Sequence, residues 1–206
     1  MSIEKLQNYL PENTLSYIEK LLIKQNILIK ITNTRQTRLG SFRATSKKQQ
    51  HVINITGSLN PYSFLLTLVH EIAHLKVWEL YKRSAKPHGA EWKNIFTNLM
   101  TPLILANVFP KDIEKPLSRH MQNPKASTTA DSSLAKALKK YDNNNSELLL
   151  LEDISENSQF LWRGNRVFVK REKLRKRYKC VEINTEKVYL FSPLAEVELL
   201  EDEMVI

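Results

Sequence analysis

The sequence predicts an α+β protein made of two parts, a mixed helical and β part followed by a small all-β part. Apolar residues recur at helical spacing over residues 62–81 and 90–100. From residue 148 to residue 197 the pattern changes to short runs separated by turn residues, which is typical of β-hairpins. Three β-branched or alternating runs precede the first long helix and predict a small three-stranded sheet. These runs are 27–32, 35–43 and 51–56.

The helices of the first part have recognisable starts and ends. Residues 3–25 have a helical pattern that Pro11 interrupts. The longest helix follows Asn60-Pro61, where asparagine suits the cap and proline suits the first helical position. Pro87 and Gly89 then predict a break before the helix that begins at about Ala90.

Composition changes after the second of these helices. Residues 110–130 are rich in Pro, Ser, Thr and Lys and show no apolar period, so we expect a linker that crosses the surface. A short helix is expected at 131–141. The predicted limits are therefore 1–112 for the first domain, 113–147 for a linker with a short helix, and 148–206 for a small basic β unit.

Composition also excludes several classes of protein. The chain has 206 residues, of which 42% are hydrophobic and 26% are charged, and this excludes a wholly disordered, collagen-like or coiled-coil chain. The single cysteine, Cys180, excludes an internal disulfide framework and any metal site built from several thiolates, and we expect it to be a small buried side chain. The sequence shows no signal peptide and no apolar segment long enough to span a bilayer. We therefore expect a cytoplasmic protein, or one associated with the nucleoid, that does not bind membranes.

The most specific motif lies inside the longest predicted helix and has the sequence His70-Glu71-Ile72-Ala73-His74. At about 100° per residue, the two histidines lie about 40° apart on one helix face, where both imidazoles can bind one metal ion. Glu71 lies on the adjacent edge, where it can act as a general base without binding the metal. With 5 histidines in the chain, chance gives roughly 0.01 such matches.

Two histidines are too few for a catalytic zinc site, which takes three protein ligands and a water. His88, in the loop after the helix, and Glu91, on the next helix, are the two candidates for the third ligand, and the spacing favours His88. His51 precedes a strand and His120 lies in the expected linker, so we expect both to be ordinary surface residues.

The stretch from Leu66 to Trp92 resembles the SprT-like (Spartan-type) family of zinc metalloproteases. That family combines a HExxH helix with a loop and a His-Gly-Pro-Glu-aromatic segment. Here the segment is His88-Gly89-Ala90-Glu91-Trp92, with Ala90 in the place of proline. Residues 37–42 and 51–56 are similar to the family's strand region, so the resemblance covers about residues 10–110.

The resemblance implies a zincin-like catalytic domain, formed by helices and a small three-stranded sheet around the HExxH helix. It implies one Zn²⁺ per chain, held by His70, His74 and His88. It also implies that Glu71 is the catalytic base and that Glu91 is not a ligand.

Many SprT-like proteins end in a zinc ribbon with paired cysteines, which this chain cannot form because Cys180 stands alone. The hairpins after residue 148 resemble a ribbon that has lost its metal and holds together by apolar packing. The residues expected to supply that core are Phe160, Trp162, Phe168, Val181, Tyr189 and Phe191.

The net charge of +9 is concentrated in the β unit. Residues 163–179 contain nine basic side chains and one acidic side chain, Glu172, which gives this segment a net charge of +8. Basic side chains bind phosphates, and neighbouring aromatic rings can stack on unpaired bases, so we expect binding to DNA, single-stranded DNA included. The candidate contacts are Arg163, Arg166, Lys170, Arg171, Lys173, Arg175, Lys176, Arg177 and Lys179. An acidic tail follows, with Glu196, Glu198, Glu201, Asp202 and Glu203.

Together these observations predict a zinc-dependent endopeptidase whose protein substrates are bound or crosslinked to DNA. The alternative is a DNA-binding adaptor with a structural or vestigial zinc site, although such a site has no need of Glu71 as a base. A third alternative is a zinc hydrolase that cleaves another kind of bond, but the sequence has no nucleotide- or sugar-specific motif to support it. The sequence leaves the oligomeric state open.

Overall fold

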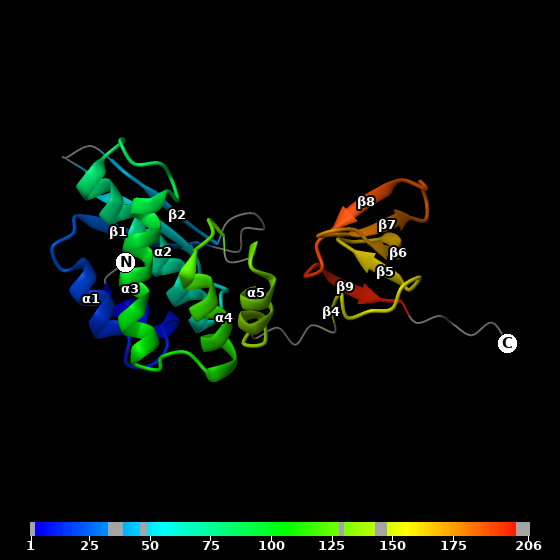
Figure 1. Ribbon diagram of the computed structural model, residues 1–206, viewed down its shortest axis with the longest axis horizontal. Coiled ribbons are helices and arrows are strands. Elements are labelled where there is room, and N and C mark those ends of the chain that lie inside the picture. The colour runs from blue at the N-terminus through cyan, green and yellow to red at the C-terminus, as the bar shows by residue number, and fades with distance from the viewer. Residues whose placement is uncertain (1–2, 33–38, 46–48, 128–129, 143–147, 201–206) are drawn as a thin grey trace. The chain divides into compact units, whose positions relative to one another are not determined.

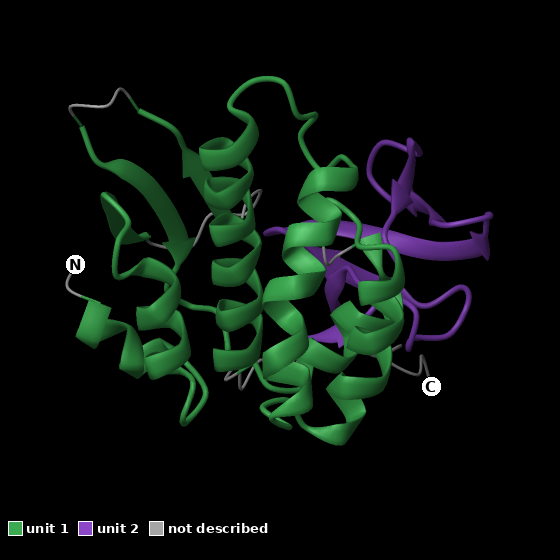
Figure 2. Cartoon of the chain, turned by 60° about the vertical axis from the view of Figure 1, so that its left-hand side comes forward, with its two compact units in different colours: residues 1–143 green, residues 144–206 purple. Residues whose placement is uncertain are grey.

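The structure, a computed structural model, describes residues 3–32, 39–45, 49–127, 130–142 and 148–200. The chain divides into two compact units, Met1–Asn143 and Asn144–Ile206, which Figure 2 shows in two colours. Each unit has its own buried apolar cluster. The first unit contains a small three-stranded sheet with helices and the second contains a separate sheet, which confirms the predicted α+β class.

The first unit is built from a three-stranded sheet and the helices that cover it. Its elements in chain order are η1 (Ile3–Tyr9), α1 (Leu15–Leu22), β1 (Ile27–Thr32), β2 (Gly40–Arg43), β3 (His51–Thr56), α2 (Pro61–Tyr81), α3 (Ala90–Leu105), α4 (Lys111–Gln122) and α5 (Ser132–Lys139). Figure 1 labels all of these except η1 and β3. Strands β1 and β3 are parallel, and β2 pairs antiparallel with the other side of β3. The order β1-β3-β2 makes β2 an edge strand.

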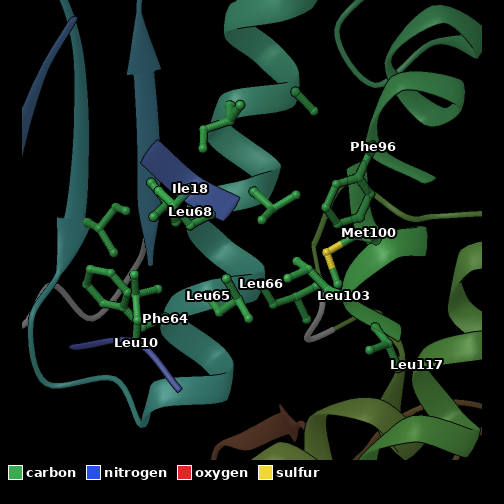
Figure 3. Close-up of a cluster of buried hydrophobic side chains, with 14 of the residues drawn as sticks. Leu10, Ile18, Phe64, Leu65, Leu66, Leu68, Phe96, Met100, Leu103 and Leu117 are labelled. Atoms are coloured by element: carbon green, nitrogen blue, oxygen red, sulfur yellow. The ribbon is translucent and has the colours of Figure 1, made fainter. Parts of the chain in front are cut away.

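Helix α2 is the central element of the first unit. Asn60 caps it by accepting a hydrogen bond from the Ser63 N–H at 2.9 Å, and Pro61 occupies the first turn, where a missing N–H has no cost. The helix is apolar on most of its surface, as expected for a helix that is buried on several sides. Figure 3 shows α2 between the strands and α3, from which Phe96 and Met100 pack against it. This packing on two sides fixes the directions in which the polar side chains of α2 point.

The segment after residue 110 differs from the predicted linker. Lys111–Gln122 form helix α4, and Ile113, Leu117 and Met121 from this helix are buried in the core of the first unit. Their spacing of four residues is a helical stripe, which the many charges of the segment and Pro116 obscure in the sequence. Pro116 removes one helical hydrogen bond, and burial of the stripe offsets that loss. The first unit therefore extends past residue 112, the limit that the sequence indicates.

Helix α5 lies where the sequence predicts a short helix, and it is tied to the start of α2. Asp131 caps α5 by accepting a hydrogen bond from the Leu134 N–H at 3.3 Å. The side-chain amide of Asn60 donates to the Leu138 carbonyl at 2.9 Å and to Asp142 Oδ1 at 2.6 Å. The residue that caps α2 therefore also holds the last turn of α5.

The second unit is a six-stranded antiparallel sheet. Its strands are β4 (Leu149–Leu150), β5 (Gln159–Trp162), β6 (Arg166–Lys173), β7 (Tyr178–Glu182), β8 (Val188–Phe191) and β9 (Glu196–Leu199). Strands β5 to β8 follow one another as hairpins, and the first turn has Gly164 at φ 90°, a conformation that favours glycine. Strand β9 returns to pair with β5 and also pairs with β4. The sheet is thus larger than the two hairpins that the resemblance to a ribbon suggests.

The core of the second unit agrees with most of the predicted residues. Phe160, Phe168 and Phe191 are buried, with Trp162 and Tyr189 packed against them. Cys180 is fully buried in the same cluster, as predicted, and burial raises the pKa of its thiol to about 11. Leu151, Ile154 and Val197 complete the cluster. Val181 is the exception, because it follows Cys180 in β7 and its side chain therefore points to the other face of the sheet.

Three parts of the predictions lie outside the described residues: residues 35–38 of the second predicted strand, residues 143–147 at the end of the predicted linker, and Glu201, Asp202 and Glu203 of the acidic tail. Within the described part of the chain, no helix is both long enough and apolar enough to cross a membrane.

Candidate metal centre

Three histidine side chains of the first unit converge on one point. His70 and His74 come from consecutive turns of α2, and His88 comes from the loop between α2 and α3. The Nε2 atoms of His70 and His88 are 3.1 Å apart, those of His70 and His74 are 3.2 Å apart, and those of His74 and His88 are 3.0 Å apart. In the part of the chain that the structure describes, this is the group of side chains that could hold a metal ion, and Glu91 does not belong to it.

The three nitrogen atoms fit a metal ion better than a set of hydrogen bonds. A neutral imidazole nitrogen either donates or accepts, so three such atoms in a triangle cannot satisfy all three contacts at once. Two nitrogen ligands of one tetrahedral zinc, each at ~2.0–2.1 Å from it, are about 3.3 Å apart, close to the observed 3.0–3.2 Å. Three histidines are also an established donor set for a catalytic metal. The cluster can therefore bind a metal ion.

Burial keeps the three imidazoles in the neutral form that binds metals. Burial, followed by the proximity of His74, His88 and His120, lowers the pKa of His70 to about 3. Burial, followed by the proximity of His88, lowers the pKa of His74 to about 4. Burial also lowers the pKa of His88. An incoming cation therefore does not have to displace protons from these rings at neutral pH.

His88 reaches the cluster through a left-handed backbone conformation. Its φ is 56°, a value that is uncommon outside glycine although histidine tolerates it better than most residues. Gly89 follows as the N-cap residue of α3, where it has no side chain to bond to the first turn of the helix. Conformations of this kind persist where the surrounding structure fixes them, and they concentrate at functional sites. The loop thus turns the chain back so that His88 meets α2.

Trp92 forms an aromatic wall behind the histidines. It is fully buried, and its ring centroid lies 4.6 Å from that of His70, 5.5 Å from that of His74 and 4.7 Å from that of His88. It also stacks on Phe96 at 4.8 Å, and the Phe96 ring lies 5.6 Å from that of His70. Rings packed at these distances restrict one another's rotamers and exclude water from this side of the cluster.

Glu71 lies beside the cluster without being part of it. Its side chain faces strand β2, is 5% exposed, and accepts a hydrogen bond from the backbone N–H of Phe42. Burial raises the pKa of Glu71 to about 7, and the Phe42 N–H opposes that rise. A carboxyl group with a pKa near 7 is suited both to take up a proton and to return it.

The other two histidines of the chain lie outside the cluster. His51 is half-buried, and its Nδ1 accepts a hydrogen bond from the Thr45 N–H at 3.0 Å. His120 is not the surface residue that the sequence predicts: it is 3% exposed, and its Nδ1 lies 3.2 Å from Asp131 Oδ2. The reason is that His120 belongs to the buried stripe of α4 rather than to a linker.

Sequence reasoning missed three residues that shape the centre. Trp92 is part of the motif that resembles the family, but the sequence predicts no role for it. Gly40 and Phe42 of β2 are not predicted to belong to the site. A side chain at Gly40 would collide with α2, because an added Cβ would lie 2.9 Å from Glu71 Oε1. Glycine inside a short strand often marks a close approach of this kind, so a signal was present in the sequence.

Residues 12–114 match the SprT-like family. The chain belongs to this family. Its members are generally associated with metallopeptidase-like function, and the match includes the three histidines, Glu71 and Trp92. No curated protein and no solved structure matches the chain.

The basic segment of this SprT-like protein is spread along strand β6. Arg163 lies in the turn before this strand, Arg166 is its first residue and Lys173 is its last, so the length of β6 separates the two ends by roughly 25 Å. Four exposed cations lie close together where β6 passes into β7, and we call them the basic turn. They are Lys173, Arg175, Lys176 and Arg177.

Several of the other predicted contacts are engaged within the second unit. Lys170 is not available to a phosphate, because it is 4% exposed and its ammonium donates to the Ile154 carbonyl. Arg166 pairs with Glu182 at 2.7 Å. Lys179 pairs with Glu172 of β6 at 3.2 Å. These residues have partners that a nucleic acid would have to displace.

Two further predicted contacts are partly engaged. The Arg163 guanidinium lies over the Trp162 ring at 4.5 Å, and Arg171 donates a hydrogen bond to Asn157. The basic turn makes two contacts of the same kinds, from Arg177 to the Leu190 carbonyl at 3.3 Å and from Lys173 to the Tyr178 ring at 5.3 Å. It is set apart because its four cations are all exposed and lie close together in the sequence.

Proposed function

We propose that this protein is a zinc-dependent endopeptidase whose substrates are proteins bound or crosslinked to DNA. The observation that carries the proposal is the convergence of three histidine Nε2 atoms beside a buried carboxyl group that is not one of the ligands. His70, His74 and His88 would hold one zinc ion. Three protein ligands leave one coordination position open, as in catalytic rather than structural zinc sites. Bound zinc polarises a peptide carbonyl and lowers the pKa of a coordinated water from 15.7 towards ~7.

Glu71 supplies the proton transfers of the proposed reaction. Its carboxylate accepts a proton from the attacking water as the new C–O bond forms at the peptide carbonyl. It then returns the proton to the departing nitrogen as the C–N bond breaks, so the products are a carboxyl group and an amine. The buried position of Glu71 limits competition from other waters.

The outer edge of strand β2 is the place that we assign to an extended substrate, because no strand in the described part of the chain pairs with it. The Leu39 carbonyl accepts from the Thr56 N–H at 2.9 Å, so alternate residues from Leu39 onward pair with β3. The backbone groups of Gly40 and Phe42 then face away from β3. A peptide that adds to this edge as a further strand would pass the Glu71 carboxylate, which the Phe42 N–H holds there.

The basic turn supports the second half of the proposal, which is recruitment to DNA. Its four cations are exposed and lie within five consecutive residues. Clustered cations bind the phosphate backbone because they release the counterions that are condensed on the nucleic acid. A protease unit joined to such a unit would meet proteins that are attached to DNA.

The test is cleavage of a histone by the zinc-loaded protein, with and without single-stranded DNA. We expect the wild type to cleave, with stimulation by DNA. We expect Glu71→Gln to bind the same amount of zinc and to lose about 10²- to 10⁴-fold in rate, because it removes the general base. Glu79→Gln is the matched control, since Glu79 is an exposed glutamate on the same helix.

Two results would contradict the proposal in different ways. Cleavage by Glu71→Gln at the wild-type rate would remove Glu71 from its role as base. Full zinc content without cleavage under any DNA condition would favour a DNA-binding adaptor with a structural zinc site.

A further inference from the structure

We propose that Gly40 is a positioning residue for Glu71: because it has no side chain, the Glu71 carboxylate can lie against strand β2, where the Phe42 amide holds it. The inference rests on the proposed role of Glu71 as base and deepens it. It assigns a specific function to a residue that does not touch the substrate or the metal ligands.

The space at Gly40 is the first observation. A Cβ added there would lie 2.6 Å from Thr67 Cγ2, 2.9 Å from Glu71 Oε1 and 3.2 Å from Glu71 Cγ. Atoms in favourable contact are about 3.5–4.0 Å apart, so any side chain would push α2 or the Glu71 carboxylate away. Gly40 is not among the residues with positive φ, so its backbone conformation is open to other residues and only the close approach requires glycine.

The position of Phe42 is the second observation. Gly40 and Phe42 are two residues apart on β2, so their outward backbone groups lie on the same edge. The Phe42 N–H donates to the Glu71 carboxylate, and the missing side chain of Gly40 leaves room for Glu71 Oε1. Strand β2 therefore provides both a hydrogen bond and an empty volume for one carboxyl group.

The two neighbours of Gly40 on α2 have separable roles. Thr67 and Glu71 are one helical turn apart, and both face β2. The Thr67 hydroxyl donates to the Ser63 carbonyl at 2.7 Å, whereas its methyl group is the atom nearest to Gly40. Thr67→Ser removes that methyl group and keeps the hydroxyl. When Gly40→Ala is also present, Thr67→Ser therefore removes the steric clash between the new methyl group and residue 67. It leaves the clash with Glu71 in place.

The metal ligands lie away from this contact. The atoms nearest to a Cβ at position 40 belong to Thr67 and Glu71 and not to a metal ligand. His70 and His74 pack against Trp92 of α3. Displacement of Glu71 by an added methyl group should therefore leave zinc binding intact. Misplacement of a reacting group by about 1 Å can cost 10²-fold in rate.

The experiment compares the wild type, Gly40→Ala, Thr67→Ser and the double variant. We expect Gly40→Ala to lower the melting temperature by several degrees and kcat by about 100-fold, and Thr67→Ser to resemble the wild type. The double variant should recover most of the melting temperature but not kcat. KM and the zinc content should stay at wild-type values in all four proteins.

Affinity for acetohydroxamate gives a readout that does not depend on turnover. This small ligand binds zinc and hydrogen-bonds a carboxylate beside it, so a displaced Glu71 should weaken its binding. By calorimetry, the double variant should bind it as weakly as Glu71→Gln does, and Thr67→Ser should bind it as the wild type does.

Recovery of both kcat and acetohydroxamate affinity in the double variant would overturn the proposal, because Gly40 would then only make room for Thr67. Wild-type kcat in Gly40→Ala would overturn it as well. If the wild type fails to cleave proteins, the proposed function fails, and the acetohydroxamate affinities alone decide whether Gly40 positions Glu71.

Discussion

The metal centre of the first unit and the basic turn of the second unit are built in opposite ways. The three histidines are held by a fully buried tryptophan and come from a helix and a loop that the core fixes. The four cations of the basic turn are exposed and belong to one hairpin. The centre therefore depends on the tertiary structure of its unit, whereas the turn depends mainly on local structure and charge.

This difference predicts different responses to substitution. A change at the centre should alter metal binding, chemistry and stability together, because the same packed side chains serve all three. A change in the basic turn should alter affinity for an anionic partner and leave the fold in place. The predictions below test this separation, beginning with the largest expected effect.

Removal of one histidine should have the largest effect, because the centre has three protein ligands. We expect His74→Ala to lose bound zinc. The variant should then also lose the stabilisation that zinc binding gives the wild type, about 4 kcal/mol when the free zinc concentration is 1,000 times Kd. Elemental analysis and thermal unfolding with and without chelator measure both. His51→Ala is the control, since His51 lies outside the cluster. Full zinc content in His74→Ala would place the ion elsewhere.

Truncation of the aromatic wall should come next. Trp92→Ala removes a fully buried side chain that contacts all three histidines, and such truncations cost about 3–5 kcal/mol. Urea unfolding should show this loss together with weaker zinc binding, and Trp92→Phe should show a smaller loss of both. Trp78→Ala, at a half-buried tryptophan on α2, is the comparison. Equal losses of stability and of zinc affinity at the two positions would show that Trp92 contributes no more to the centre than Trp78 does.

Neutralisation of the basic turn should act on affinity alone. We expect the quadruple variant with Lys173, Arg175, Lys176 and Arg177 changed to Gln to bind single-stranded DNA at least about 10-fold more weakly, with a salt slope smaller by about 3. Its melting temperature and zinc content should be unchanged. Fluorescence anisotropy at several salt concentrations measures the affinity.

The matched control for that variant makes the same change in net charge on the first unit. It replaces four exposed lysines, Lys20, Lys24, Lys111 and Lys115, with Gln. If this control weakens DNA binding as much as the basic-turn variant does, the overall charge of the chain governs binding and the turn does not.

The smallest predicted effect is a pH dependence in the second unit. The hydrogen bond from Arg166, followed by that from Thr185, lowers the pKa of Glu182 to about 2. The ordinary value is about 4.3, so the ionised form stabilises the fold at neutral pH, and this contribution disappears as the pH falls from about 5 towards 2.

Glu182→Gln should therefore increase amide exchange in residues 166–182 at pH 7, with a difference from the wild type that shrinks in acid. Hydrogen–deuterium exchange of the full chain measures this. Glu186→Gln, at an exposed carboxylate of the same hairpin, should not change exchange at either pH. A difference that persists at pH 2 would show that the Glu182 charge is not its source.

The sequence predicted those features that depend on local pattern. The strands at 27–32 and 51–56 have the predicted limits, and helix α2 begins at the predicted Asn60-Pro61 cap. The HExxH spacing brings His70 and His74 together because that relation is internal to one helix. The structure also brings His88 next to these two histidines, where spacing alone left Glu91 as the alternative.

The features that sequence reasoning missed depend on contacts between distant segments. Helix α4 forms because the core buries its apolar stripe, and burial of His120 follows from the same packing. The role of Gly40 depends on how closely α2 approaches β2, which no local pattern encodes. Lys170 was grouped with exposed cations because it lies among them in the sequence, but strand alternation turns its side chain towards the core.

The hydrogen bond between Asn60 and Asp142 joins the end of the first unit to the start of helix α2. Asp142 is the last described residue before the chain passes to the second unit, and its carboxylate accepts a hydrogen bond from the residue that caps α2. A force that pulled the two units apart would therefore act on the capped end of the histidine-bearing helix as well as on α5.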